Sequence, residues 1–308
     1  MSFALLQQKI DELKNPAVVG LDPDLAHIPP QIIDKYFAEF GETPEAASRA
    51  VIEFNINLIS GLCDIVPAVK PQSAYYEALG HHGALALKMT CDYAKSKGMY
   101  VIIDAKRNDI GSTAAAYSAA YLGSVKIGSA EFMPYDADAL TVNAYLGSDG
   151  ILPFIDTAIR FDKAVFALVK TSNPSAGELQ DKLLSGEQSK TLYTAVGELM
   201  EEISADTQGE YGYTRVGAVV GATYPDEMKF LREHLKRTFF LVPGYGAQGG
   251  SAADAAYAFC ENGRGAIVNS SRSIIAAWKT SNESGIHYVD AARKAALKMR
   301  DELRNALK

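Results

Sequence analysis

Short apolar runs alternate with longer amphipathic segments along the chain. Eight of these runs are rich in β-branched residues and have the length of strands buried on both faces. They lie at 17–21, 65–69, 100–104, 139–143, 164–169, 216–221, 239–242 and 266–268. Helical spacing of apolar residues predicts helices at 45–59, 83–96, 113–121, 191–203, 226–235, 252–261 and 288–307. Because a crossover long enough for a helix follows each strand, the pattern predicts a parallel β/α architecture.

Two folds share this alternation, a closed (β/α)8 barrel and an open doubly wound sheet. The count of eight strands favours the barrel, and the first strand is not followed by the G-x-G-x-x-G motif of a dinucleotide-binding sheet. The sequence contains no internal repeat or clear linker, so residues 1–308 are predicted to form a single (β/α)8 TIM-barrel domain. The segments after strands one and five are longer than usual and are expected to carry covering loops or insertions.

The composition is typical of a globular protein. Of the 308 residues, 48% are hydrophobic and 22% are charged, and the net charge is −7. This acidic balance argues against nucleic acid as a partner but permits a local basic pocket for a small anion. The N-terminus does not resemble a signal peptide, and the apolar runs are too short to span a membrane. The three cysteines, Cys63, Cys91 and Cys260, are far apart in the sequence, so neither disulfides nor structural zinc is expected. Cysteines without disulfides favour a location in the reducing cytoplasm.

Charged residues follow the second and third predicted strands. Side chains alternate across a strand, so Asp104 and Lys106 point to the same side, and Asp109 follows three residues later. Lys70 comes directly after the second strand. In a barrel these strand ends meet at one mouth, where active sites are built. Unpaired buried charges are costly, so these four residues require a structural or chemical reason.

Four interpretations of this charge set are open. One is a structural ion-pair network, although buried ion pairs stabilise proteins only weakly. A site for a hard cation at Asp104 and Asp109 is disfavoured because Lys70 and Lys106 would repel the ion. A Schiff-base lysine is disfavoured because a lysine flanked by carboxylates should stay protonated and be a poor nucleophile. A protonated lysine held between two acids is suited to stabilising a developing carbanion and delivering a proton to it.

The last two strands are followed by groups that suit an anion. The sequence PGYGAQGG at 243–250 follows strand seven, and Arg272 lies in the Ser-Ser-Arg-Ser run after strand eight. Glycines let backbone N–H groups approach an anion, and arginine can chelate phosphate oxygens. A plain turn and a surface arginine are the alternatives. The two features together predict a phosphate site, because many barrels bind phosphate at this position.

In this order and at these positions, the motifs resemble the orotidine 5′-phosphate decarboxylase family, in its longer subgroup. The pattern D-x-K-x-x-D-I-x-x-T occurs at 104–113, and the P-G-x-G-A-Q-G-G turn occurs at 243–250. The resemblance covers essentially the whole barrel. Further matching residues are Asp22 after strand one, Lys70 after strand two, Ser172 before the strand-five proline and Arg272 after strand eight.

The resemblance implies a homodimeric barrel that uses no cofactor or metal and converts orotidine 5′-phosphate to UMP and CO₂. This reaction is the last step of de novo pyrimidine nucleotide synthesis. On this basis Lys106 stabilises the C6 carbanion and protonates it, while Asp104 lies against the substrate carboxylate. Lys70 bridges Asp104 to the ribose, and Asp109 reaches in from the partner subunit.

The resemblance also implies which residues bind the substrate. Asp22 is expected to bind a ribose hydroxyl, and Ser172 and Gln248 are expected to hold the pyrimidine. Thr113 is expected to cross the subunit interface, and Arg272 is expected to grip the phosphate, with Gln248 nearby. The expected substrate-binding set is Asp22, Thr113, Ser172, Gln248, Gly249, Gly250 and Arg272.

Two rival functions remain at this point. The first is a related Mg²⁺-dependent phosphosugar enzyme with the same strand-three motif. On the same family resemblance, that branch has a glutamate that helps bind the metal after strand two, where this chain has Lys70. The second is a nucleotide-binding barrel without catalytic activity. Because Lys70, Asp104, Lys106 and Asp109 are all present, the decarboxylase is favoured over both.

Overall fold

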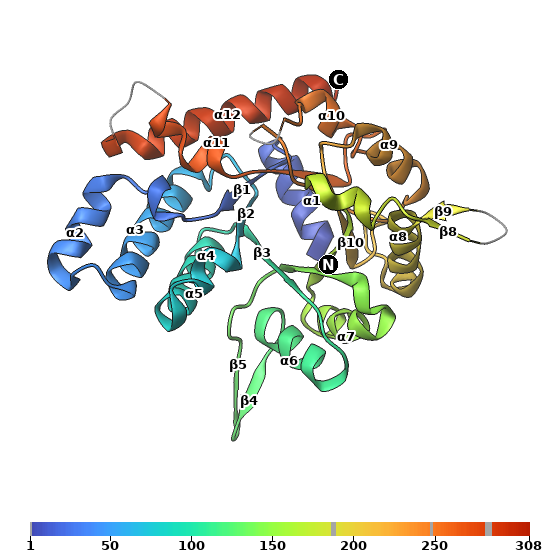
Figure 1. Ribbon diagram of the computed structural model, residues 1–308, viewed down its shortest axis with the longest axis horizontal. Helices are drawn as coiled ribbons and strands as arrows, with labels where there is room; N and C mark the ends of the chain where they lie inside the picture. Colours follow the sequence, from blue (N-terminus) through green and yellow to red (C-terminus); the bar gives the residue numbers. More distant parts are fainter. Residues whose placement is uncertain (1, 186–188, 247–248, 281–284) are drawn as a thin grey trace.

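The computed structural model describes residues 2–185, 189–246, 249–280 and 285–308 (Figure 1). Eight parallel strands form a closed barrel in the order β1-β12-β11-β10-β7-β6-β3-β2. This arrangement confirms the predicted (β/α)8 fold. The barrel strands are β1 (Ala17–Leu21), β2 (Ala68–Pro71), β3 (Tyr100–Arg107), β6 (Ala139–Val142), β7 (Ala164–Lys170), β10 (Val216–Val220), β11 (Phe240–Val242) and β12 (Ala266–Ser270).

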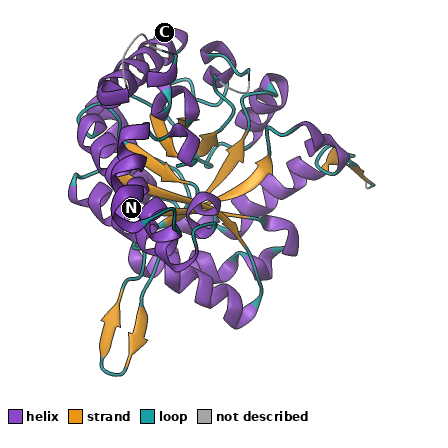
Figure 2. Ribbon diagram, turned by 60° about the vertical axis from the view of Figure 1, so that its left-hand side comes forward, coloured by secondary structure: helices purple, strands orange, loops and turns teal. Residues whose placement is uncertain are grey.

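Helices surround this barrel, and two short hairpins extend from it (Figures 1 and 2). The helices are α1 (Ser2–Leu13), α2 (Pro30–Phe40), α3 (Pro44–Leu62), α4 (Ser73–Glu77), α5 (Gly80–Ser96), α6 (Gly111–Tyr121), α7 (Leu152–Phe161), α8 (Leu192–Ile203), α9 (Pro225–His234), α10 (Ala252–Ala256), α11 (Arg272–Ile275) and α12 (Tyr288–Ala306). The hairpins are β4 (Val125–Ile127) with β5 (Ala130–Phe132), and β8 (Leu183–Leu184) with β9 (Lys190–Thr191). None of the described helices is both long and apolar enough to cross a membrane.

All eight predicted strands are present, but most predicted boundaries differ from the observed ones by one or more residues, and two of these differences have clear local causes. The second strand begins at Ala68 rather than at residue 65, because the N–H groups of Ile65 and Val66 donate back to Leu62 and so complete a turn after α3. The predicted helix at 252–261 ends at Ala256, as α10. Beyond that point the N–H groups of Ala258 and Phe259 bond three residues back, and the chain turns.

The apolar core has two parts. The larger part lies between the barrel and its surrounding helices. The smaller part fills the barrel interior, where Phe3, Leu6 and Ile10 of α1 pack against the strands. The Ser2 hydroxyl also donates to the Asp138 carbonyl oxygen, which ties α1 to the start of β6. Helix α1 therefore closes the N-terminal end of the barrel and leaves the opposite end for the site.

Side-chain alternation along the strands brings polar groups to that opposite end. On four strands an apolar residue in the barrel interior is followed, two positions later, by a polar residue on the same face. On β7, β10 and β11 the corresponding interior residues stay apolar, as Leu168, Val219 and Leu241. The mouth of the barrel therefore has a polar half and an apolar half. The polar pairs are Ala68 and Lys70, Ile102 and Asp104, Ala139 and Thr141, and Ile267 and Asn269.

Candidate active site

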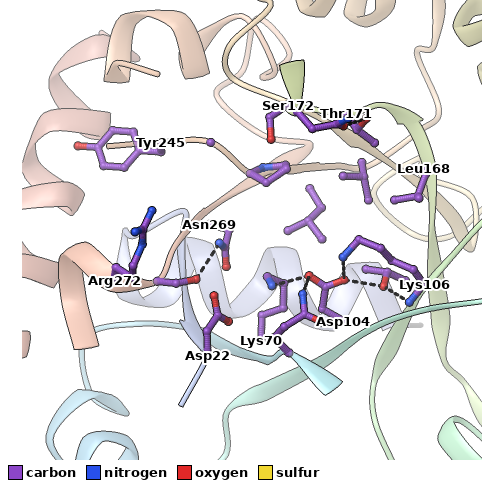
Figure 3. Close-up of a pocket in the computed structure, with 18 of the residues that line it drawn as sticks. Asp22, Lys70, Asp104, Lys106, Leu168, Thr171, Ser172, Tyr245, Asn269 and Arg272 are labelled. Atoms are coloured by element: carbon purple, nitrogen blue, oxygen red, sulfur yellow. Dashed lines mark hydrogen bonds and ion pairs between the residues drawn. The ribbon is translucent and has the colours of Figure 1, made fainter. Parts of the chain in front are cut away.

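A cavity of about 470 Å³ opens at the carboxyl ends of the barrel strands. This volume lies in the range of pockets that bind small molecules. Figure 3 shows Lys70, Asp104 and Lys106 grouped together, with Tyr245 and Arg272 on the other side of the cavity. Leu168, Val219 and Leu241 supply its apolar lining. The cavity thus combines an apolar surface with separate polar groups on opposite sides.

Asp104 is the centre of the charged side. Its Oδ2 accepts hydrogen bonds from Lys70 Nζ at 2.7 Å and from Gln72 Nε2 at 3.0 Å. Its Oδ1 accepts from Lys106 Nζ at 2.7 Å and from Thr141 Oγ1 at 2.8 Å. An ionised carboxylate has about four lone-pair sites, so these four donors saturate the group. The carboxylate is thereby fixed in position and cannot rotate to meet a ligand without losing a bond.

The charges in this group reinforce one another. Burial alone would raise the pKa of the Asp104 carboxyl, but the ammonium groups of Lys70 and Lys106 outweigh burial and hold that pKa far below its ordinary value. Burial alone would lower the pKa of Lys70, but the carboxylates of Asp104 and Asp22 outweigh it and raise that pKa. At neutral pH Asp104 is therefore negative and Lys70 is positive.

Lys106 differs from Lys70 in its exposure and backbone. The Lys106 side chain is 45% exposed, whereas the Lys70 side chain is only 5% exposed. Lys106 also has a left-handed backbone, with φ of 48°, at an irregular end of β3 where the pairing with β6 changes register. The two lysines share Asp104 and both line the cavity, but the side chain of Lys106 is much the more exposed of the two.

Polar atoms without partners lie on the strand ends next to this group. Within the described part of the chain, the buried Oδ1 atoms of Asp22 and Asn269 accept no hydrogen bond. Both residues line the cavity. Gly20 permits this arrangement, because a Cβ there would lie 1.9 Å from Ser271 Oγ and 3.1 Å from Asn269 Oδ1. Two acceptors that would otherwise be costly to bury are thus available to the hydroxyl donors of a ligand.

The cavity does not have the residues of a magnesium site. All four acceptor positions of Asp104 are occupied, and a cation beside it would meet the ammonium groups of Lys70 and Lys106. In the described ranges, His, Cys, Asp and Glu side chains form no group of three or more that could hold a metal ion. The Asp104 carboxylate is therefore suited to holding the ammonium groups of two lysine side chains and not a metal ion.

Comparison with known proteins agrees with the fold. Residues 18–284 match the model of the "Orotidine 5′-phosphate decarboxylase / HUMPS family". The chain belongs to this family. An orotidine 5′-phosphate decarboxylase of Rhodopirellula baltica is 42% identical over 99% of each chain, and that of Caldicellulosiruptor bescii is 40% identical over 89% of each. The structure of Leishmania donovani OMP decarboxylase superposes with a TM-score of 0.73 at 29% identity, over 99% of this chain and 98% of that one.

Six of the residues expected from the family resemblance meet at the cavity. Asp109 and Thr113 do not line it. Asp109 lies beyond β3, where its Oδ1 accepts from the Ile110 N–H at 2.7 Å, and Thr113 is exposed in the first turn of α6. Their predicted roles therefore require a second protomer. The six residues at the cavity are Asp22, Lys70, Asp104, Lys106, Ser172 and Arg272.

The glycine-rich turn after β11 is only partly described. Gln248 lies outside the described residues. The N–H groups of Gly249 and Gly250 donate to the carbonyl oxygens of Gly246 and Gly244, and neither glycine lines the cavity. The roles of Gln248, Gly249 and Gly250 in binding the substrate stay predictions.

Several residues that form the site were not predicted from the sequence. Thr141 is the single polar residue of β6, and this exception to the apolar pattern was the signal that could have identified it. Asn269 directly follows the apolar run of β12, so its place at a strand end was the corresponding signal. Gln72 continues the same face of β2 two residues after Lys70. Gln180 gave no such signal, because it reaches the cavity through a loop, where its side chain bonds Thr171.

Proposed function

We propose that this protein catalyses the cofactor-independent decarboxylation of orotidine 5′-phosphate to UMP and CO₂, the last step of de novo pyrimidine nucleotide synthesis. The observation that carries the proposal is the Asp104 group, which holds an exposed lysine ammonium at a small-molecule cavity. Membership of the orotidine 5′-phosphate decarboxylase / HUMPS family supports the same reaction. The saturated carboxylate and the two lysines favour it over a magnesium-dependent phosphosugar reaction.

The reaction places a specific demand on the site. When the bond between C6 and the carboxylate breaks, the electron pair stays on C6 in the plane of the ring, where the π system cannot delocalise it. The Lys106 ammonium would stabilise this carbanion by its charge and then transfer a proton from Nζ to C6, while CO₂ leaves. The resulting neutral amine would regain its proton from solvent. Asp104, next to the departing carboxylate, would keep Lys106 aimed at C6.

One lysine is not enough to account for the expected rate. Enzymes lower barriers by about 8–23 kcal/mol, and this reaction should need the upper part of that range. Removing one preorganised donor typically costs about 3–4 kcal/mol. The rest would come from groups remote from C6, with Arg272 binding the phosphate and Asp22 a ribose hydroxyl. Ser172 and Gln248 would hold the pyrimidine.

An ultraviolet absorbance assay of purified protein tests the reaction directly. Loss of orotidine 5′-phosphate should be matched by formation of UMP, and the rate should be unchanged by excess EDTA. Loss of activity in EDTA, with recovery on adding Mg²⁺, would move the assignment to the phosphosugar branch. Binding of UMP without any turnover would identify a nucleotide-binding barrel.

We also propose that the protein is a cytoplasmic homodimer in which Asp109 and Thr113 complete the cavity of the partner subunit. Asp109 directly precedes Ile110, which is 57% exposed, and Thr113 follows three residues after Ile110 in the first turn of α6. The β4–β5 hairpin projects from the body of the protein (Figure 2) and exposes Ile127 and Phe132. Exposed apolar side chains on a projecting hairpin are typical of a contact surface. The free cysteines support a cytoplasmic location.

Active-site complementation tests the shared site. Lys106→Ala and Asp109→Ala subunits, co-expressed with different tags and purified through both tags, should form dimers with about half the wild-type activity, because one of the two equivalent sites contains neither substitution. Each variant alone should be inactive. A mixed dimer as inactive as its parents, or a fully active Asp109→Ala homodimer, would contradict the role of Asp109 across the interface.

A further inference from the structure

Thr141 takes no direct part in the proposed proton transfer. It lies on β6 inside the barrel, is 1% exposed, and touches both Asp104 and Lys106. Its Oγ1 is 2.9 Å from the backbone nitrogen of Lys106 and 2.8 Å from Asp104 Oδ1. One hydroxyl thus links the backbone of the lysine to the carboxylate that holds its side chain.

The directions of these hydrogen bonds follow from the protons available. The backbone N–H of Lys106 can only donate, so Thr141 Oγ1 is the acceptor. The hydroxyl has a single proton, and the ionised Asp104 can only accept, so that proton points to Oδ1. Lys106 Nζ donates to the same oxygen. These three hydrogen bonds close a ring in which Lys106 takes part through both its backbone N–H and its side-chain ammonium.

The backbone of Lys106 needs this support. Its φ of 48° is left-handed, a conformation that lysine rarely adopts. The pairing of β3 with β6 also changes register between Ile103 and Arg107, which interrupts the regular ladder next to Lys106. In this irregular stretch the backbone N–H of Lys106 donates to the side-chain hydroxyl of Thr141.

We propose that Thr141 is a positioning residue for the decarboxylation, because its hydroxyl fixes the left-handed turn that points the Lys106 ammonium toward both Asp104 and the cavity. This inference rests on the proposed function. A hydroxyl is required, since a methyl group in its place would leave the Lys106 N–H without an acceptor and remove one of the four donors to Asp104.

Three substitutions separate positioning from stability. Thr141→Val keeps the shape and removes the hydroxyl, Thr141→Ser keeps the hydroxyl, and Thr90→Val is the matched control. Thr90 is also 1% exposed, and its hydroxyl accepts from Asn55 Nδ2 at 3.1 Å, away from the cavity. Thr141→Ala removes the same hydroxyl if the valine variant does not fold.

We expect Thr141→Val to lower kcat about 100-fold, the cost of a small displacement of a reacting group, with little change in the Kd of UMP. Thr141→Ser should restore kcat to within about fivefold of the wild type, and Thr90→Val should lower stability without lowering kcat. A folded Thr141→Val variant with kcat within about threefold of the wild type would overturn the proposal.

Amide hydrogen exchange at Lys106 gives a measurement that does not depend on turnover. The Lys106 amide should exchange at least about tenfold faster in Thr141→Val than in the wild type, and at an unchanged rate in Thr90→Val. Unchanged exchange in Thr141→Val would refute the positioning role even if the wild type decarboxylates its substrate. If exchange is faster in Thr141→Val but the wild-type protein has no decarboxylase activity, only the proposed function is refuted.

Discussion

Two networks of lysines and aspartates lie at opposite ends of the barrel. The mouth network consists of Lys70, Asp104 and Lys106 at the carboxyl ends of the strands. The base network lies at the amino ends, where its aspartates and Lys163 precede β6 and β7. The base network consists of Lys95, Asp136, Asp138 and Lys163.

The two networks use their charges differently. In the base network each lysine is within 3.6 Å of both aspartates, so two positive and two negative groups neutralise one another. In the mouth network two lysines share Asp104, and Lys106 faces a cavity. The same residue types therefore form a closed, neutral set at one end and a set that opens onto a cavity at the other. We infer that buried Lys–Asp pairs indicate catalysis only where a ligand can reach them, which in a barrel is the carboxyl end of the strands.

The largest expected effect is on turnover, through Lys106→Ala. Loss of both electrostatic stabilisation and the proton donor should lower kcat by at least about 10⁴-fold, because each function alone is worth about 10²–10³-fold or more. Steady-state assays measure this effect. The Kd of UMP should change little, because the residues proposed to bind the phosphate and the ribose, Arg272 and Asp22, are unchanged in this variant.

The stability of the same variant is its internal control. The Lys106 side chain is 45% exposed, and Lys70 still pairs with Asp104 when Lys106 is removed, so Lys106→Ala should lower the urea midpoint much less than the loss of a buried lysine from the base network. A variant that unfolds at much lower urea would assign Lys106 a structural role and remove the contrast with the base network. Near-normal kcat would refute its proposed chemical role.

The base network should show the opposite behaviour. Lys163→Met removes a 7% exposed ammonium and leaves two aspartates to share Lys95. Breaking a buried pair in this way costs about 3 kcal/mol or more, which urea unfolding can measure. We expect kcat to stay within about twofold of the wild type, because the network does not line the cavity. A large fall in kcat without loss of stability would contradict the comparison.

Much of the mouth network could be predicted from sequence because its parts are local. Alternation along a strand places Asp104 and Lys106 on one side, and parallel strands bring Lys70 to the same end of the barrel. The eight strands were identifiable for the same reason, since each is a short run buried on both faces. The family resemblance then supplied the roles of these residues, which periodicity alone leaves open.

The remaining features depend on contacts between distant parts of the chain. Thr141 meets Asp104 across 37 positions, so its importance appears only when β3 and β6 are paired. Helix α1 packs on the barrel base, yet its amphipathic pattern would suit many other surfaces. The β4–β5 hairpin has strands of only three residues each, too short for apolar periodicity to identify.

The smallest effect concerns acid stability, and it distinguishes Asp104 from Asp136. Burial would raise the pKa of each carboxyl, but neighbouring lysines outweigh it and lower both pKa values, much further at Asp104. A carboxyl whose pKa is depressed in the folded state stabilises the protein above its unfolded pKa, about 3.9, and loses that contribution as the pH falls toward its folded pKa.

The stability difference between the wild type and Asp104→Asn should therefore be constant above about pH 5 and should decrease below pH 4 by up to about 1.4 kcal/mol per pH unit. The corresponding difference for Asp136→Asn should decrease less, because a smaller depression is exhausted sooner as the pH falls. Urea unfolding at pH 6, 5, 4 and 3 would measure both. Equal decreases for the two variants would contradict this expectation. They would mean that two lysines stabilise a single carboxylate no more than two lysines stabilise a pair of carboxylates. The distinction between the open and the closed network would then lose its electrostatic basis.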